Sequence, residues 1–257
     1  MTTATDTQEA VGTSNLRFDF TGRTVIVTGA GKGIGRSLAE AFAGANADVV
    51  LVGRSAEALE EVAATTGGTA VTADVAKTAD AERVVAETMA RTGRIDVLVN
   101  NAGFLRDSMV WKMDDDAWDD VLDVHLGGTF RFIRACAPHF RAQKYGRIIN
   151  MTSYSGLHGN LGQANYSAAK AGIVGLTKAA AKELGRSGVT VNAVLPFADT
   201  GMTASIPEDK KAALVASVPL GRVAAADEMA AVVAFLASAE AGYVTGNVVN
   251  VDGGISM

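Results

Sequence analysis

Short apolar runs rich in β-branched residues alternate along the chain with longer segments in which apolar residues recur every three or four positions. The short runs predict strands at residues 24–28, 48–53, 69–74, 96–100, 147–151, 189–195 and 247–251. The longer segments predict helices at residues 33–43, 56–64, 80–92, 115–143, 164–184 and 227–239. Strands that alternate with helices are joined by right-handed crossovers, so the pattern predicts an α/β fold whose parallel sheet has helices on both faces.

The stretch between Thr200 and Leu220 interrupts this alternation. It contains Pro207, Pro219 and a charged patch at residues 208–211. Two interpretations remain open: an insertion that lies over the site, or an ordinary surface connection.

Length and composition fit one α/β domain. The chain has 257 residues, 48% of them hydrophobic, which is enough for a full core. Residues 1–15 lack the basic start and apolar centre of a signal peptide, so we expect a disordered leader followed by a domain of residues 16–257. The longest apolar stretch, residues 229–239, is too short to span a bilayer, so we expect no membrane partner.

Charge and cysteine content exclude further classes. The net charge is -5 and no long basic run occurs, which argues against a nucleic-acid partner. Cys136 is the only cysteine, so the chain has no internal disulfide and offers no cysteine metal cluster. These features predict a cytoplasmic protein without a metal, in which Cys136 is a small buried hydrophobe.

A glycine-rich run follows the first predicted strand and opens the first predicted helix. Residues 28–35 read Thr-Gly-Ala-Gly-Lys-Gly-Ile-Gly. Glycines at this point allow a tight turn and a close approach of the backbone to a pyrophosphate, whose charge the helix N-terminus favours. An ordinary strand-to-helix turn is the alternative. The cofactor-binding candidates in this run are Gly29, Lys32, Gly33, Ile34 and Gly35.

The end of the second strand bears on the choice of cofactor. Sites that prefer NAD carry an acid there, which bonds the ribose hydroxyls. Here the end reads Val-Gly-Arg-Ser, and Arg54, helped by Ser55 and Lys32, would hold a 2′-phosphate. This favours NADP(H), with NAD(H) still possible. A solvent-facing arginine at a helix start is the alternative interpretation of Arg54.

Tyr166 and Lys170 are candidates for acid–base chemistry on a carbonyl or alcohol. Positions four apart share one face of a helix, so the Lys170 ammonium would lie near the phenol and lower its pKa, which is ordinarily about 10. The hydroxyl of Ser153, thirteen residues before Tyr166, would bond the substrate oxygen, where charge develops during hydride transfer.

In order and spacing, these motifs resemble the short-chain dehydrogenase/reductase family over essentially residues 20–254. The resemblance rests on residues 28–35, Asp74-Val75, Asn100-Asn101-Ala102-Gly103, Ser153, Tyr166, Lys170 and residues 251–254. It implies a single Rossmann-type, doubly wound domain with a seven-stranded parallel sheet. It also implies that Asp74 and Val75 lie at the adenine and Asn101, with Ala102 and Gly103, near the cofactor ribose. Tyr166 would be the acid/base and Lys170 would bind the ribose.

Two stretches depart from the family pattern. His125 stands where relatives carry an asparagine that holds a water connecting the lysine to bulk solvent. An imidazole can also donate and accept, so His125 either serves this relay with altered pH behaviour or is a structural histidine. The second stretch, residues 196–200, lacks the usual glycine after Pro196 and is shorter by one residue. Thr200 would still contact the nicotinamide, and Phe197 would line or shift its pocket.

The departures, together with residues 159–166, resemble the hydroxyacyl-CoA dehydrogenase part of peroxisomal multifunctional enzymes. The overall pattern and length of the chain also resemble bacterial 3-oxoacyl-acyl-carrier-protein reductases, and both subgroups act on 3-oxoacyl or 3-hydroxyacyl thioesters. We therefore expect an oxidoreductase that interconverts these thioesters by hydride transfer. The alternatives are a secondary-alcohol, steroid or sugar dehydrogenase of the same family, or a cofactor-binding protein without turnover. The resemblance also implies a homotetramer, with a dimer as the alternative.

Overall fold

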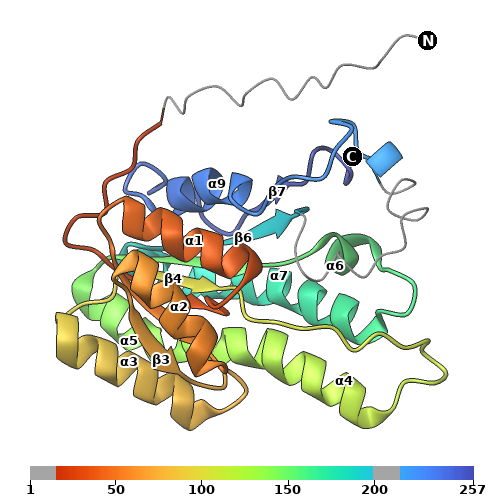
Figure 1. Ribbon diagram of the computed structural model, residues 1–257, viewed down its shortest axis with the longest axis horizontal. Coiled ribbons are helices and arrows are strands. Elements are labelled where there is room, and N and C mark those ends of the chain that lie inside the picture. The colour runs from red at the N-terminus through yellow and green to blue at the C-terminus, as the bar shows by residue number, and fades with distance from the viewer. Residues whose placement is uncertain (1–15, 199–214) are drawn as a thin grey trace.

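One parallel sheet organises the molecule (Figure 1). The computed structural model describes residues 16–198 and 215–257. Seven strands lie in the order β3-β2-β1-β4-β5-β6-β7, and every pairing is parallel. The strands are β1 (Thr24–Thr28), β2 (Asp48–Gly53), β3 (Thr69–Thr72), β4 (Val97–Asn100), β5 (Gly146–Met151), β6 (Val189–Pro196) and β7 (Val248–Val251). This confirms the predicted fold class and all the predicted strands.

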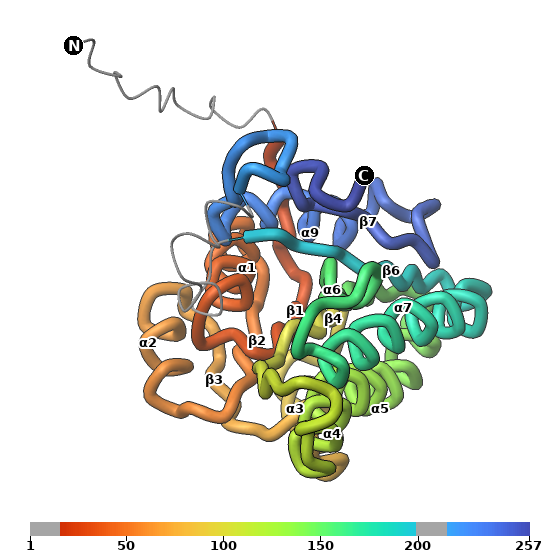
Figure 2. Tube along the Cα trace, turned by 90° about the vertical axis from the view of Figure 1, so that its right-hand side faces the viewer, coloured from red at the N-terminus to blue at the C-terminus, as the bar shows by residue number. Residues whose placement is uncertain are grey.

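Helices cover both faces of the sheet, as Figure 2 shows. On one side lie α1 (Gly33–Gly44), α2 (Ala56–Thr66) and α9 (Glu228–Ala237), and on the other lie α3 (Thr78–Thr92), α5 (Gly128–Gln143) and α7 (Ala164–Leu184). Two buried apolar clusters fill the two interfaces: Phe42 of α1 belongs to one, and Phe132 of α5 to the other. The strands are apolar on both faces because both faces are covered.

The strand order changes direction between β1 and β4. After β1 the chain adds β2 and β3 on one side of it, and then returns to add β4 to β7 on the other side. Ligands of such sheets bind at the carboxyl ends of the strands beside this change of direction. In this chain the glycine-rich run follows β1, and Asn101 follows β4.

The structure differs from the predicted elements in the long helix at residues 115–143. It consists of α4 (Asp115–Leu122), a π-helical turn η1 (Asp123–Gly127) and α5. The apolar period continues across the turn, so the pattern does not reveal it. Two short elements were also not predicted, α6 (Tyr154–His158) and the 3-10 turn η2 (Gly185–Ser187), because each is too short to show a period.

Some predictions fall on residues outside the described ranges. These are the leader at residues 1–15 and most of the stretch between Thr200 and Leu220, including Thr200 itself. The division into a leader and a domain of residues 16–257 therefore stays a prediction. No helix in the described part of the chain is long and apolar enough to cross a membrane.

Candidate active site

The glycine-rich turn is packed so closely that side chains would not fit. A Cβ at Gly35 would lie 2.1 Å from the carbonyl oxygen of Gly29, and Gly29 itself has a left-handed φ of 68°. Lys32, the N-cap of α1, makes no side-chain capping hydrogen bond. The first N–H groups of α1 therefore stay available to an anion, and the cradle fits a dinucleotide pyrophosphate.

Asn101 ties the end of β4 to this turn. Its side-chain amide donates to the carbonyl oxygens of Thr28 at 3.0 Å and Gly29 at 3.3 Å. The hydroxyl of Thr28 in turn accepts from the backbone N–H groups of Asn101 at 2.9 Å and Ala102 at 3.1 Å. Asn101 thus shapes the cradle, a role that the sequence did not indicate.

The end of β2 brings a cation to the same edge of the sheet. Arg54 is exposed, and its guanidinium carbon lies 5.9 Å from the ring centroid of Phe104. The Ser55 hydroxyl accepts from the backbone N–H of Ala58 at 3.3 Å and so caps α2. The predicted cofactor role of Arg54 is compatible with this position, whereas Ser55 already has a structural task.

The predicted adenine contacts follow β3. Asp74 is half-buried, and one of its carboxylate oxygens accepts from the N–H of Ala76 at 3.0 Å. Val75 is buried against Gly128 of α5, where a Cβ would lie 2.9 Å from a Val75 methyl carbon. Both residues lie at the carboxyl edge, one strand beyond Arg54.

Lys170 is buried on α7 with only 4% of its surface exposed. Its ammonium donates to the carbonyl oxygen of Met151 at 2.6 Å and lies 5.6 Å from the ring centroid of Tyr166. Burial lowers the pKa of Lys170 to about 7. The bond to Met151 joins α7 to the end of β5, which leads into Ser153.

Tyr166 and Ser153 face each other across the α6–α7 connection. Burial raises the pKa of Tyr166, a hydrogen bond with the Ser153 side chain lowers it, and the negative charge of Asp107 raises it. The net effect is a raised pKa for Tyr166, whereas the helical spacing predicted that Lys170 would lower it. The largest cause is burial of the phenol, which disfavours the charged phenolate. Tyr166 therefore holds its proton at neutral pH.

His125 lies on the π-helical turn, beneath the Tyr166 ring. Only 2% of its surface is exposed, and the two rings meet edge to face with centroids 5.1 Å apart. Its Nε2 lies 3.1 Å from the Phe104 backbone nitrogen and 2.8 Å from the Phe104 oxygen. Nδ1 is buried and has no hydrogen-bond partner among the described residues. Burial, with the nearby charge of Lys170, lowers the pKa of His125 to about 3, so the ring is neutral.

Gly103 makes room for this histidine, since a Cβ at Gly103 would lie 2.1 Å from His125 Cε1. The structure thus brings together Ser153, Tyr166, Lys170 and His125, with Gly103 against them.

Two site residues escaped the sequence analysis. The Gln163 amide donates to Asp107 at 3.0 Å, and its oxygen accepts from the Ser155 hydroxyl at 2.9 Å. Asp107 is also the charge that raises the pKa of Tyr166. The one signal in the sequence is position: Gln163 directly precedes the helix of Tyr166, and Asp107 follows the turn at residues 100–103.

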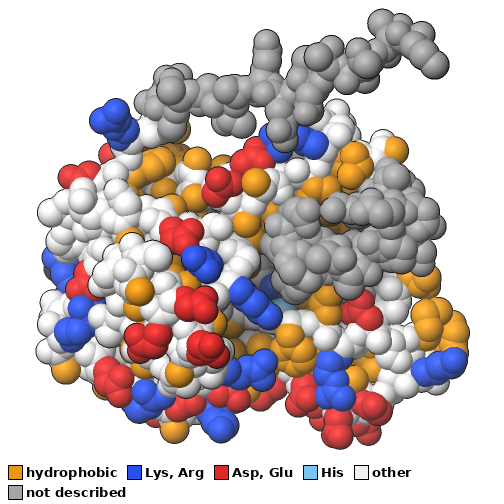
Figure 3. All heavy atoms as spheres, viewed as in Figure 1, with side chains coloured by type: hydrophobic (Ala, Val, Ile, Leu, Met, Phe, Trp, Pro, Cys, Tyr) orange, Lys and Arg blue, Asp and Glu red, His pale blue; other side chains and the backbone are white. Residues whose placement is uncertain are grey.

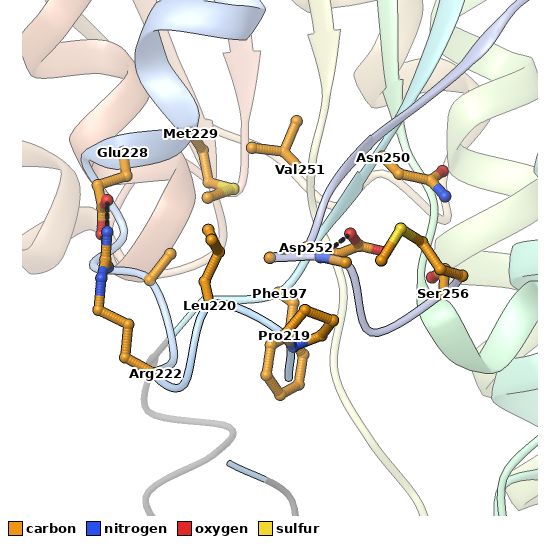
Figure 4. Close-up of a pocket in the computed structure, with 14 residues that line it drawn as sticks. Phe197, Pro219, Leu220, Arg222, Glu228, Met229, Asn250, Val251, Asp252 and Ser256 are labelled. Atoms are coloured by element: carbon orange, nitrogen blue, oxygen red, sulfur yellow. Dashed lines mark hydrogen bonds and ion pairs between the residues drawn. The ribbon is translucent and has the colours of Figure 1, made fainter. Parts of the chain in front are cut away.

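The loop after β6 opens onto a cavity of about 600 Å³, shown in Figure 4. Pro196 is the last residue of β6 and pairs with Val251 of β7, and the next N–H, of Phe197, donates to the Val251 oxygen at 3.0 Å. Phe197 and Pro219 line the cavity together. The assignment of Thr200 to the nicotinamide cannot be placed here, because Thr200 lies outside the described residues.

Comparison with known proteins places this geometry in a family. Residues 29–256 match a family model described as enoyl-(acyl carrier protein) reductase. The chain belongs to the short-chain dehydrogenase/reductase family. It is therefore an oxidoreductase of the CH-OH/C=O class, of a family that binds nicotinamide cofactors.

Several relatives in this family share one name. The chain is 41% identical over 241 residues to the 3-oxoacyl-[acyl-carrier-protein] reductase of Salmonella typhimurium, covering 93% of this chain and 99% of the relative. It is 40% identical over 242 residues to the enzyme of that name from Escherichia coli, with the same coverage. It is 43% identical over 242 residues to that of Staphylococcus epidermidis, covering 91% of this chain and 99% of the relative. Near-complete coverage means that the relatives contain no large domain that this chain lacks.

Proposed function

We propose that this chain reduces 3-oxoacyl thioesters to 3-hydroxyacyl thioesters. The observation that carries the proposal is the convergence of Ser153, Tyr166 and Lys170 at the ends of β5 and α7, on the edge that holds the glycine-rich cradle. The names of the relatives indicate the substrate class.

Each residue has a task in this reaction. The Ser153 hydroxyl donates to the 3-oxo oxygen, and the Tyr166 phenol gives that oxygen its proton. The raised pKa of Tyr166 suits reduction, because the phenol is protonated at neutral pH. When bound, the nicotinamide supplies the hydride. Lys170 would donate to the cofactor ribose, while its bond to Met151 holds α7 against β5.

His125 is proposed to take part in proton supply to Lys170. Its unpartnered, buried Nδ1 is the supporting observation, since a neutral ring can accept a hydrogen bond from a water there. The low pKa makes the ring an acceptor that stays uncharged during turnover.

We propose NADPH as the preferred cofactor. Arg54 supports this choice, because it is exposed at the end of β2 beside the cradle and the strand ends without an acid. A guanidinium binds a phosphate through two parallel hydrogen bonds, and such charge-assisted bonds are each worth about 1.5–3 kcal/mol. NADH lacks the 2′-phosphate and would gain nothing from Arg54.

Reduction of an enoyl thioester is the second candidate, because the matching family model carries that description. It differs in where the proton goes: the hydride reaches a carbon of the double bond and the proton its neighbour. Ser153 and Tyr166 favour the 3-oxo reaction, because their hydroxyls lie within hydrogen-bond reach of each other and could both bond one carbonyl oxygen.

The test is a substrate panel with three proteins: wild type, Tyr166→Phe and Arg54→Ala. Wild type should reduce acetoacetyl-CoA with NADPH faster than it reduces crotonyl-CoA, a steroid ketone or a sugar ketone. Tyr166→Phe should lose about 10²–10⁴-fold in kcat and still bind NADPH, since the phenol proton acts only in the chemical step. Arg54→Ala should raise KM for NADPH and leave KM for NADH in place.

Three results would contradict the proposal. If crotonyl-CoA were turned over faster than acetoacetyl-CoA, enoyl reduction would become the favoured function. A tenfold preference for a steroid or sugar ketone would show that the substrate is not a 3-oxoacyl thioester. More than about a tenth of wild-type activity in Tyr166→Phe would remove Tyr166 from acid–base chemistry.

We further propose a cytoplasmic homotetramer. Partly exposed aromatic residues on the outer face of α4 and α5, Trp118 and Phe130, support self-association. The resemblance to the family favours four copies over two.

A further inference from the structure

Exposed apolar side chains gather where two loops meet. Of the exposed large hydrophobic residues in the described part of the chain, Val110, Trp111, Leu157 and Leu161 lie in just two short segments. We call these four residues the apolar lip. Figure 3 shows hydrophobic side chains at the right-hand edge, where in Figure 1 the segment before α4 approaches the connection from α6 to α7. Trp111 is 70% exposed and Leu161 is 81% exposed, so the lip is open to a ligand.

Hydrogen bonds hold the two loops together and fix the lip. The N–H of Ser108 donates to the oxygen of Gly162 at 2.8 Å, and Ser108 forms an isolated bridge with Gln163. A turn that presents Trp111 is closed by the N–H of Lys112, which donates to the Met109 oxygen at 2.8 Å.

A second turn presents Leu161: the N–H of Gln163 donates to the Asn160 oxygen at 3.1 Å. Because these bonds fix the backbone of both turns, a ligand would not have to order the loops when it binds.

The lip is continuous with the candidate active site. Leu157 lies on α6, four residues after Ser153, the N-cap of that helix. Gln163 follows Leu161 closely and bonds Asp107, whose charge acts on Tyr166. A substrate whose carbonyl lies between Ser153 and Tyr166 therefore has the lip as its nearest exposed apolar surface on these two loops.

We propose that the apolar lip receives the acyl chain of the substrate and sets the preference for long chains. The inference rests on the proposed function, since it takes the substrate to be a 3-oxoacyl thioester. Two parts of the substrate extend from its 3-oxo carbon. One is the apolar acyl chain, and the other is the thioester that leads to a phosphorylated, anionic carrier. Apolar contact favours the acyl chain.

Charge beside the lip excludes the carrier arm. The segment after Trp111 leads into α4, and its aspartates are Asp114, Asp115, Asp116, Asp119 and Asp120. Only Asp120 has a cationic partner among the described residues, Arg106, at 2.6 Å. Lys112, which follows Trp111, and Arg106 are the cations beside these five aspartates, so the local charge stays negative. An anionic carrier would be repelled here, while a hydrocarbon chain would not.

The cavity beside Phe197 is the rival position for the chain. It has apolar walls, including Leu220, which is 69% exposed. Among its lining residues, however, are none of Ser153, Tyr166 or Lys170. Leu220 thus offers a matched control: an exposed leucine next to a different apolar surface.

The experiment compares acetoacetyl-CoA with 3-oxodecanoyl-CoA in wild type, Trp111→Ala, Leu161→Ser and Leu220→Ser. Trp111→Ala and Leu161→Ser should each lower kcat/KM for 3-oxodecanoyl-CoA about tenfold, the loss of roughly two buried methylene contacts. Their kcat/KM for acetoacetyl-CoA should stay within about twofold of wild type, which also shows that the variants fold. Leu220→Ser should match wild type on both substrates.

Several outcomes overturn the inference. If Trp111→Ala or Leu161→Ser lowered kcat/KM equally for both substrates, the lip would have a structural role and no role in binding the acyl chain. A loss specific to Leu220→Ser would place the chain in the cavity beside Phe197. A lower particle mass of Trp111→Ala or Leu161→Ser in light scattering would make the lip a contact between copies. Absence of acetoacetyl-CoA turnover in wild type would overturn the proposed function itself, and the lip proposal with it.

Discussion

Tyr166 and Lys170 are shifted by burial toward their uncharged forms. The pKa of the phenol is raised and that of the ammonium is lowered to about 7. Spacing of four on a helix predicted that the two side chains lie together, and their ring-to-nitrogen distance of 5.6 Å agrees. It could not predict that the ammonium would bond Met151, because that contact depends on how α7 packs against β5.

His125 yields a prediction for stability against pH. Its pKa in the folded chain, about 3, lies below the ordinary value of 6.5. The unfolded chain therefore binds a proton that the folded chain does not. The histidine's contribution is complete above pH 6.5 and is lost as the pH falls toward 3. His125→Asn, which cannot titrate, should flatten the fall in Tm over this window.

The measurement is Tm by calorimetry from neutral pH to about pH 5, where a single group changes the free energy of unfolding by at most about 1.4 kcal/mol per pH unit. His158→Asn, at an exposed position on α6, is the matched control and should keep the wild-type dependence. Identical slopes for His125→Asn and wild type would mean that the folded and unfolded chains protonate this ring over the same pH range.

At the scale of elements, sequence pattern located those with a strong period. β1, β2 and α7 begin and end where the pattern predicts. The π-helical turn at Asp123–Gly127 stayed hidden, because the buried positions Val121, His125 and Thr129 are four apart, a spacing that an ordinary α-helix also shows. That turn carries His125, so the undetected irregularity coincides with the site.

A buried chain of amides joins three elements below the site. The Asn100 amide of β4 donates to the Asn150 oxygen of β5 at 2.8 Å, and the Asn150 amide donates to the Thr177 hydroxyl of α7 at 2.9 Å. All three residues are buried, and the two asparagines are register partners. These two hydrogen bonds fix α7, and with it Tyr166, relative to the ends of both strands.

Asn150→Val should destabilise the protein more than Thr177→Val. The first leaves buried polar groups without partners on Asn100 and Thr177, and the second leaves only the Asn150 amide, at about 1–3 kcal/mol for each group. Urea unfolding of the two variants and wild type measures the difference. If Thr177→Val lost more stability than Asn150→Val, the hydrogen bond between Asn100 and Asn150 would not contribute as proposed.

At the scale of the molecule, the fold class followed from the alternation of strands and helices, and the edge that holds the site followed from the strand ends. What sequence could not provide is the pairing of distant loops. Ser108 meets Gly162, and Asp107 meets Gln163, through contacts between segments more than fifty residues apart. No local pattern encodes them, so the apolar lip and the charge acting on Tyr166 became visible only in the structure.

The outer face of α4 and α5 leads to the last prediction, which concerns assembly. Phe130 is 45% exposed and borders a groove of about 490 Å³ with Leu122 and Leu126. If copies pair on this face, Phe130→Asp would bury an unpaired carboxylate at the contact, at a cost of several kcal/mol. Light scattering should give wild type four times the 26.4 kDa chain mass and Phe130→Asp a smaller particle. Tyr243→Asp, at a fully exposed position away from both helices, should keep the wild-type mass. A monomeric wild type, or an unchanged mass for Phe130→Asp, would exclude this face as the contact.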